Sequence, residues 1–499
     1  MAILTTTIRT GAVRGLETAV PGITVFKGIP FAKAPAGELR WKAPVAPEAW
    51  EGERLCDDFG YSCWQRNNND SPMFKKMQEI NPVPPRPLRM DEDCLSLNVW
   101  TPAVSADERL PVMVWFYGGN LHSGTSDDII FDGEALCKFG VLLVTVNYRV
   151  NVFGYFGHPD LEKENEHHSS GNYGLQDQIF ALQWIHDNIA AFGGDAGSVT
   201  IFGCSGGGRS VQGISCSPLS RGLVHHAVCH SAGGLNPNYS LAYDKIKELG
   251  VEFVAYCGKK TIDEMRAIPA QELEEKYIQF GKQFNITGDG YALPYTMDEV
   301  VRRGEQADLD YLLCTMNDEF IMPPRQPVTL ANFDEMRPTF GLRTSILGQV
   351  VHPRTDEEAY DVVARAEAYE MKAAQLAWAQ VQAKQPKKPV RLSTFVHPVP
   401  SHDDGSARHG DDQYYVFHTM YKFAHPYGEK DEAVSQRLMR YWTNFAKTGD
   451  PNGEGLPAWT PYTQDSPLTL TIDTDDCRME DRSHPIIEEV AATYRDYKA

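Results

Sequence analysis

The chain has 499 residues, of which 42% are hydrophobic and 23% are charged. This balance is typical of a folded globular protein and excludes an intrinsically disordered chain. The 47 basic and 67 acidic side chains give a net charge of −20, and no basic run is long enough to follow a phosphate backbone. Nucleic acid is therefore excluded as a partner.

The first residues, MAILTTTIRTGAVRG, lack the basic and apolar regions of a secretory signal. No window reaches about 18 consecutive apolar residues, so no membrane partner is expected. Ten cysteines are too few for a disulfide scaffold, and they form no CxxC pair of the kind that binds zinc. We expect a soluble, cytoplasmic protein with no metal.

Predicted strands and helices alternate along the chain. Apolar runs and alternating segments predict strands, apolar residues at helical spacing predict helices, and the Pro-rich segment 67–90 predicts a long surface loop. The expected strands are 23–26, 110–117, 140–146, 199–202 and 390–396, and the expected helices are 175–191 and 357–383. The sequence shows no internal repeat, no low-complexity segment and no clear domain boundary, and its length alone does not decide the number of domains.

Ser205 stands in the segment Gly203-Cys204-Ser205-Gly206-Gly207, directly after the predicted strand 199–202. The pattern G-x-S-x-G between a strand and a helix is typical of a nucleophilic serine on a strained turn. Glycines in that turn leave room for neighbouring backbone. A glycine-rich structural turn is the alternative, and the preceding strand favours the catalytic interpretation.

A second glycine pair, in Tyr117-Gly118-Gly119-Asn120, follows the predicted strand 110–117. A serine that cleaves esters needs N–H donors for the negative oxygen that develops during attack. The backbone amides of Gly119, Asn120 and Gly206 are candidates for this oxyanion hole. A plain Gly-Gly strand exit is the alternative interpretation.

At this point the sequence resembles the type-B carboxylesterase and cholinesterase family over nearly its whole length, and in character the bacterial para-nitrobenzyl-esterase-like carboxylesterases. The matching segments follow the family's order, which is far more specific than any single motif. They are GIPFA at 28–32 with LRW at 39–41, EDCLSLNVW at 92–100, NYR at 147–149, GNYGLQDQ at 171–178, NI at 188–189 with FGGD at 192–195, and WTNFAKTGDPN at 442–452.

The resemblance implies a single α/β-hydrolase domain over residues 1–499, of the α/β class, with a large central, mostly parallel mixed sheet flanked by helices, and no cofactor. It also implies a Ser-Glu-His triad, whose acid falls at Glu319 and whose base falls at His409. The order serine, acid, histidine is the one this fold uses. Asp318 is the rival acid and His402 the rival base.

Four positions depart from the family's usual residues. Cys204 replaces Glu before the nucleophile, Gly206 replaces Ala after it, Asn120 replaces the third glycine of the oxyanion loop, and Tyr117 replaces a histidine found in many esterases. A buried carboxylate near the base would favour the imidazolium, so a thiol at 204 should place the acidic limb of the pH–rate profile lower than a glutamate would. Cys204 itself is a weaker candidate for the nucleophile, because the turn presents Ser205.

Cys63 and Cys94 occupy the positions of the family's first disulfide, and without an export signal we expect them to be reduced in a cell. Trp64 is the only tryptophan of that loop, so an aromatic platform for a quaternary ammonium group is not visible and a choline ester is disfavoured. Expected substrate contacts are Tyr117, Gly118, Cys204, Met316 and Phe320, with Met73, Met77 and Met322 as further candidates that are also typical of a plain core.

The sequence therefore predicts a bacterial serine carboxylesterase that hydrolyses small, neutral, fairly apolar esters through an acyl-enzyme on Ser205. Its predicted partner is a small-molecule ester, and the predicted assembly is a monomer or a small homo-oligomer. One alternative is a specialised hydrolase of a polar or polycarboxylate ester or a lactone, with Arg209 or another arginine as the anchor. The other is a non-catalytic binding member, which the presence of Ser205, Glu319 and His409 disfavours.

Overall fold

A computed structural model describes residues 2–66, 88–321, 324, 326–336, 347, 350–423 and 425–497. Its main sheet has 11 strands in the order β14-β13-β12-β11-β10-β9-β7-β8-β6-β4-β3. All neighbouring pairs from β13 to β8 are parallel, and the strands beyond them pair antiparallel at both edges. The carboxyl ends of the central strands therefore meet along one edge, where sheets of this kind hold their sites.

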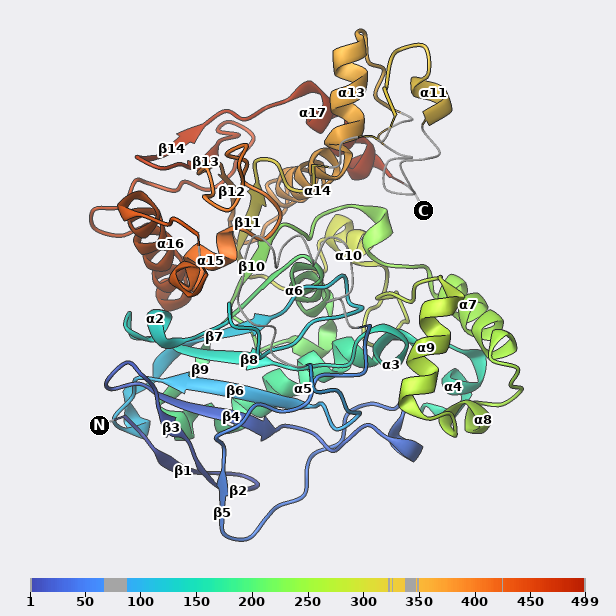
Figure 1. The fold of residues 1–499 in the computed structure, drawn as a ribbon, viewed down its shortest axis with the longest axis vertical. Coiled ribbons are helices and arrows are strands. Elements are labelled where there is room, and N and C mark those ends of the chain that lie inside the picture. The colour runs from blue at the N-terminus through green and yellow to red at the C-terminus, as the bar shows by residue number, and fades with distance from the viewer. Residues whose placement is uncertain are drawn as a thin grey trace.

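The strands of this sheet are β3 (Leu16–Glu17), β4 (Thr24–Pro30), β6 (Ser96–Thr101), β7 (Leu110–Phe116), β8 (Leu142–Val146), β9 (Gly194–Cys204), β10 (His226–His230), β11 (Asp310–Met316), β12 (Val390–Phe395), β13 (Thr469–Ile472) and β14 (Cys477–Glu480). A separate small sheet contains β1 (Thr5–Ile8), β2 (Gly11–Arg14) and β5 (Glu53–Leu55) and lies at the bottom of Figure 1. The central strands are apolar and buried throughout, as parallel strands covered on both faces must be.

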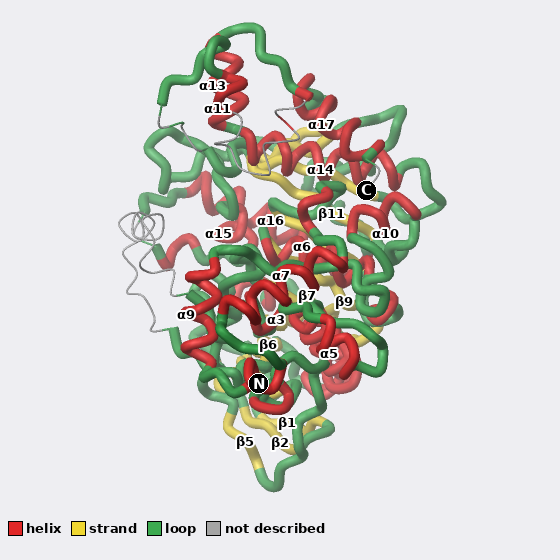
Figure 2. The backbone as a smooth tube through the Cα atoms, turned by 90° about the vertical axis from the view of Figure 1, so that its right-hand side faces the viewer, coloured by secondary structure: helices red, strands yellow, loops and turns green. Residues whose placement is uncertain are grey.

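Helices cover both faces of the main sheet (Figures 1 and 2). On one side lie α5 (Tyr173–Asn188), α6 (Gly206–Cys216), α10 (Met297–Arg303), α14 (Ala366–Gln382) and α17 (Pro485–Asp496). On the other lie α2 (Glu134–Cys137), α15 (Asp412–Val416) and α16 (Glu429–Thr448). The remaining helices are α3 (Asn151–Tyr155), α4 (Pro159–Glu164), α7 (Tyr243–Tyr256), α8 (Ile262–Arg266), α9 (Ala270–Phe280), α11 (Phe333–Met336) and α13 (Asp356–Ala364).

The predicted strands all form, with shifted ends. The expected strand 140–146 begins only at Leu142, because Gly140 turns with a φ of 74°. The strand at 199–202 is part of the longer β9, and the helix at 175–191 ends at Asn188 and continues as a 3₁₀ turn, Ile189–Phe192. The predicted loop 67–90 lies mostly outside the described residues.

The helical stretch predicted over 357–383 forms as two consecutive helices, α13 and α14, and not as one. Arg365, with φ −114° and ψ 16°, separates α13 from α14. Its guanidinium donates to Asp361 at 3.0 Å and to Asp318 at 2.7 Å. The contact to Asp318 spans 47 residues, so no local pattern encodes it, and neither Gly nor Pro marks the break.

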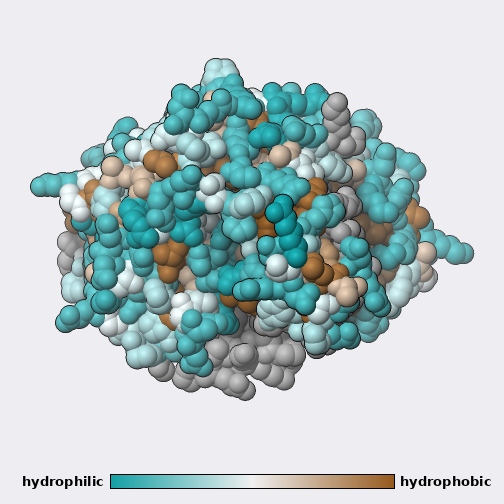
Figure 3. Space-filling model, turned by 90° about the horizontal axis from the view of Figure 1, so that it is seen from above, coloured by the Kyte–Doolittle hydropathy of each residue, from teal (hydrophilic) through white to brown (hydrophobic). Residues whose placement is uncertain are grey.

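Hydrophilic residues predominate on the face drawn in Figure 3, and its apolar residues form small, separate patches. This agrees with the net charge of −20. Among the described helices, none combines the length and the apolarity needed to cross a bilayer.

Candidate active site

Ser205 occupies the sharp turn between the end of β9, at Cys204, and the start of α6, at Gly206. Its backbone has φ 59° and ψ −121°, a conformation that costs a non-glycine residue energy and is concentrated at functional sites. The Ser205 N–H donates to the carbonyl of His230, at the end of β10, over 2.9 Å. This hydrogen bond to β10 therefore helps to keep Ser205 in its strained backbone conformation.

Gly207 allows α6 to begin against the adjacent strand. A Cβ atom at this position would lie 1.9 Å from the carbonyl oxygen of Phe116, the last residue of β7. Only glycine fits there, which explains why the turn needs this residue type.

Glu319 and His409 meet beside the carboxyl end of β11. Glu319 Oε2 lies 2.7 Å from His409 Nδ1, and Oε1 accepts from the backbone N–H of Met316 at 2.8 Å. The His409 N–H also donates to the Glu319 carbonyl at 3.2 Å. Only 1% of Glu319 is exposed, so this contact is largely shielded from water.

The imidazole of His409 is fixed on two sides. Phe320 stacks on it with a centroid distance of 4.0 Å and an interplanar angle of 26°. Since Nδ1 is engaged by Glu319, Nε2 is the nitrogen available to a reacting group. It is buried and has no hydrogen-bond partner in the described part of the chain.

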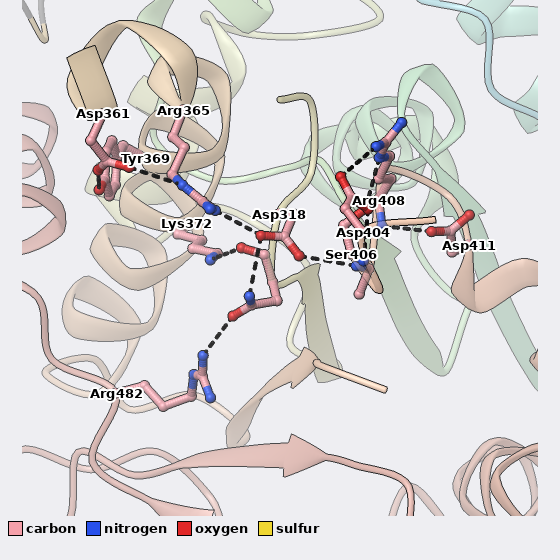
Figure 4. Close-up of polar contacts among 12 residues, drawn as sticks. Asp318, Asp361, Arg365, Tyr369, Lys372, Asp404, Ser406, Arg408, Asp411 and Arg482 are labelled. Atoms are coloured by element: carbon pink, nitrogen blue, oxygen red, sulfur yellow. Dashed lines mark hydrogen bonds and ion pairs between the residues drawn. The ribbon is translucent and has the colours of Figure 1, made fainter. Parts of the chain in front are cut away.

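The rival acid, Asp318, points away from His409. Its carboxylate accepts from Arg365 at 2.7 Å, as Figure 4 shows, and it also accepts from the Ala407 backbone N–H at 3.0 Å. Burial alone would raise its pKa, but these two donors hold the pKa below its usual value. Asp318 therefore braces the segment before His409.

The rival base, His402, is engaged elsewhere: its Nε2 lies 2.9 Å from Asp411 Oδ2. The same carboxylate oxygen accepts from the Arg408 N–H at 2.5 Å (Figure 4). His402 thus belongs to the network that holds the loop in front of His409.

The oxyanion loop after β7 adopts left-handed backbone angles, with φ 102° at Gly119, 59° at Asn120 and 67° at Leu121. A Cβ atom on Gly206 would lie 2.8 Å from the backbone nitrogens of both Asn120 and Leu121. The loop and the first residue of α6 are therefore in direct backbone contact. This contact explains Gly206: with the loop so close, the alanine usual in the family would collide.

The side chain of Asn120 is anchored on both sides. Its Oδ1 accepts from the Arg209 guanidinium, and its Nδ2 donates to Gln283 at 3.4 Å. Arg209 is 5% exposed and lies one helical turn after Ser205 on α6. Burial and the Arg209 charge lower the pKa of nearby His122 to about 3, so His122 is neutral at physiological pH.

Three of the expected substrate contacts are buried behind the site instead. Tyr117 stacks on Tyr148 with centroids 4.3 Å apart and donates to its carbonyl at 3.0 Å. Met316 is fully buried, and Cys204 is 2% exposed. Burial raises the pKa of the Cys204 thiol well above its usual range, helped by nearby carboxylates, which disfavours the thiolate that an alternative nucleophile would need.

Among the described residues, Phe320 lines the cavity beside Ser205. Gly118 packs against the turn, where a Cβ atom would lie 3.3 Å from Ser205 Cβ. Met73, Met77 and Met322 fall outside the described residues. Sequence reasoning missed most of the wall, including Glu367, Glu370 and Met371, which share one face of α14. The full lining is Asn120, Ser205, Arg209, Ser231, Ala232, Asn236, Tyr239, Phe320, Glu367, Glu370 and Met371.

All ten cysteines are buried and free, including Cys63 and Cys94. A hydrogen bond with Cys63, together with burial, raises the pKa of Cys94 well above its usual range. Within the described ranges, no group of three or more His, Cys, Asp or Glu side chains could hold a metal ion.

A mostly parallel sheet, a serine on a strained strand–helix turn and a buried carboxylate–imidazole pair together define the α/β-hydrolase class. The structure is similar to a solved PNB esterase, with a TM-score of 0.83 and 25% identity over 98% of this chain and 99% of that one. A solved thermophilic PNB esterase is similar with a TM-score of 0.81 and 26% identity over the same shares.

Residues 3–486 match the carboxylesterase family model. The human cocaine esterase is 32% identical over 92% of this chain and 86% of its own length. The medium-chain fatty acyl-CoA hydrolase precursor of the duck Anas platyrhynchos is 32% identical over 91% and 86%. The chain belongs to the carboxylesterase family and is a carboxylic ester hydrolase, which confirms the resemblance, the fold class and the enzyme class predicted above.

Proposed function

We propose that this protein is a serine carboxylesterase that forms an acyl-enzyme on Ser205. The observation that carries the proposal is the 2.7 Å contact between Glu319 and His409, which leaves His409 Nε2 as the ring nitrogen that can take a proton. The strained backbone of Ser205 supports its role as the nucleophile.

The proposed mechanism has two halves. His409 Nε2 takes the proton of Ser205 Oγ while that oxygen attacks the ester carbonyl, and Glu319 orients the imidazole and stabilises its cation. The N–H groups of Gly119, Asn120 and Gly206 hold the negative oxygen. His409 then protonates the leaving alcohol, and water cleaves the acyl-enzyme by the same route.

Reaction with a fluorophosphonate probe, followed by peptide mapping, tests the mechanism. The expected result is a covalent label on Ser205, since labelling requires the nucleophile, the base and the oxyanion donors to work together. The matched control is Ser215→Ala, which removes a buried hydroxyl near the far end of α6 and should leave labelling intact. An unlabelled Ser205 in the folded wild-type enzyme would contradict the mechanism.

For the substrate, we propose small, neutral, fairly apolar esters. Phe320, Met371, Tyr239 and Ala232 supply the apolar part of the cavity wall beside Ser205. Burial of an apolar acyl or alcohol group against them favours binding by about 25 cal/mol for each Å² removed from water.

A second candidate is a polar or carboxylate-bearing ester, including a lactone. It is favoured by the buried Arg209, which lines the cavity together with Asn236, Glu367 and Glu370. Guanidinium groups bind carboxylates in a planar, two-bonded geometry. Such a substrate would use the Arg209 face of the cavity.

Comparing kcat/KM for ethyl butyrate and monoethyl succinate separates the two candidates. The neutral-ester proposal predicts faster turnover of ethyl butyrate, and Arg209→Met should change that rate less than it changes the rate for monoethyl succinate. A preference for monoethyl succinate that Arg209→Met removes would establish the second candidate instead.

A further inference from the structure

A second cavity, of about 670 Å³, lies away from Ser205. It is enclosed by β11, β12 and β13 of the sheet, by α14, and by the segment that leads from β14 into α17. Part of its wall is apolar, with Leu376, Leu392 and Ile487 among the lining residues. The cavity is thus built from segments that are up to about 170 residues apart in sequence.

Three cationic side chains of this cavity, which Figure 4 labels, donate hydrogen bonds to the neighbouring residues Asn317 and Asp318. Lys372 Nζ donates to the Asn317 carbonyl at 2.6 Å, and Arg482 donates to the Asn317 side-chain oxygen at 2.9 Å. Arg365 donates to Asp318 at 2.7 Å. Asn317 and Asp318 directly precede Glu319, so the cations hold the segment that carries the proposed catalytic acid.

The three cations differ in their counter-ions. Arg365 pairs with Asp318 and Asp361, and Arg482 pairs with Glu480 at 3.1 Å. Lys372 pairs with no carboxylate among the described residues and has only the Asn317 carbonyl as an acceptor. Burial lowers the pKa of Lys372 to about 8, so the ammonium form still predominates at neutral pH.

The remaining titratable groups of the cavity form no ion pair with Lys372 in the described part of the chain, although Glu319 and Asp318 lie near enough to offset part of the lowering of its pKa. Asp481 accepts from the Ser483 N–H at 2.8 Å, and Glu488 accepts from Gln380 at 3.2 Å. Tyr369 donates to Asp361, and its ring stacks on His484 with centroids 5.1 Å apart. His484 Nδ1 is buried and has no hydrogen-bond partner in the described part of the chain, so this wall contains an unsatisfied polar atom.

We propose that this cavity binds a small organic carboxylate, whose charged group pairs with Lys372 and whose apolar part lies against Leu376, Leu392 and Ile487. The Lys372 ammonium donates to one acceptor among the described residues and can donate two further hydrogen bonds, and its single charge matches a monoanion better than a phosphate dianion. The apolar wall favours an organic ligand over an inorganic ion. Carboxylates are also the class of product that an ester hydrolase releases.

Helix α14 gives this site a direct connection to the other cavity. Glu367, Glu370 and Met371 line the Ser205 cavity, whereas Ala368, Lys372 and Leu376 line the second one. A carboxylate at Lys372 would share the ammonium group with the carbonyl of Asn317, two residues before Glu319, and would draw charge away from that contact. Binding is therefore expected to change kcat.

The test measures octanoate binding by calorimetry on the full chain after Ser205 has been blocked with a fluorophosphonate, so that product binding at the reactive serine is excluded. We expect one remaining site, with at least about tenfold weaker binding of octanamide, which lacks the charge. Lys372→Met should weaken octanoate binding by a similar factor. The matched control is Lys447→Met, since Lys447 lies on α16 outside the cavity and its pKa is also lowered by burial.

A second measurement needs no variant. Octanoate stays ionised between about pH 7 and about pH 9.5, whereas Lys372 loses its proton through about pH 8. Affinity should therefore fall by at least about fivefold over this range in the wild-type protein. Loss of all octanoate binding on blocking Ser205, equal binding of octanamide, unchanged binding in Lys372→Met or a flat pH profile would each overturn the proposal.

Discussion

The two cavities that share α14 differ in how their charged side chains are paired. On the Ser205 side, Glu319 and His409 are paired at 2.7 Å and nearly sealed from water. On the other side, Lys372 has a carbonyl but no carboxylate partner among the described residues. The adjacent carboxylates Asp318 and Glu319 also lie on different sides. Glu319 contacts His409, and Asp318 contacts Arg365. The difference teaches that the end of one strand can present adjacent carboxylates to two separate cavities, which the two proposals above assign to catalysis and to ligand binding.

The largest effect is expected from Ser205→Ala. Removing the nucleophile should lower kcat by about 10⁶-fold, as triad removals do in other serine hydrolases. Octanoate binding at the Lys372 cavity should persist, because no residue of that cavity changes. Steady-state kinetics and calorimetry on the same variant check both halves, and near-normal ester turnover would contradict the role of Ser205.

Glu319→Gln and Asp318→Asn form the second pair. Glu319→Gln removes the charge beside His409 Nδ1, and kcat should fall by about 10⁴-fold. Asp318→Asn keeps that contact, so kcat should fall less than about tenfold, while the unfolding free energy should drop by about 1–2 kcal/mol through the weakened pair with Arg365.

These two variants are compared by ester kinetics and by urea unfolding. Because the pKa of Asp318 is lowered in the folded state, its contribution to stability is present above its unfolded value of about 4 and is lost as the pH falls through the folded pKa. Similar kcat losses in both variants would show that Glu319 and Asp318 do not have the separate roles described above.

Gly206→Ala should have an intermediate effect. The added methyl group would lie 2.8 Å from the backbone nitrogens of Asn120 and Leu121, so the loop must move and an oxyanion donor is misplaced. We expect kcat to fall by about 100-fold. Gly428→Ala is the matched control, because a methyl group there meets no atom within 4 Å. A fully active Gly206→Ala enzyme would show that the oxyanion loop can move without a loss of kcat.

The smallest effect is a shift in pH dependence. Cys204→Glu places a carboxylate in a pocket that already lies near Asp411, Asp412 and Glu319. An added negative charge favours the imidazolium form of the base, so the acidic limb of the kcat/KM profile should move to higher pH. Cys204→Gln, which has a similar size and no charge, should leave the limb in place. Identical profiles for the Glu and Gln variants would refute the expectation.

Local signals in the sequence were sufficient for the turn at Ser205 and for the buried strands, since strand, glycines and serine are adjacent in the chain. Glu319 and His409 required the family resemblance, because nothing local distinguishes them from Asp318 and His402. The break at Arg365, the polar wall at Glu367 and Glu370, and the charge at Lys372 could not be predicted. Each depends on contacts between distant segments, and the closeness of Asn120 to Gly206 depends on backbone angles that residue types alone do not fix.

The shared wall formed by α14 also constrains any redesign of this enzyme. Residues that face Ser205 alternate along the helix with residues that face the Lys372 cavity, at intervals of one to three positions. A larger acyl pocket cannot be obtained by shifting or rotating this helix without reshaping the second cavity. Directed evolution toward bulkier esters should therefore favour changes of single side chains on the Ser205 face, and variants that displace the helix should alter the response to carboxylates as well.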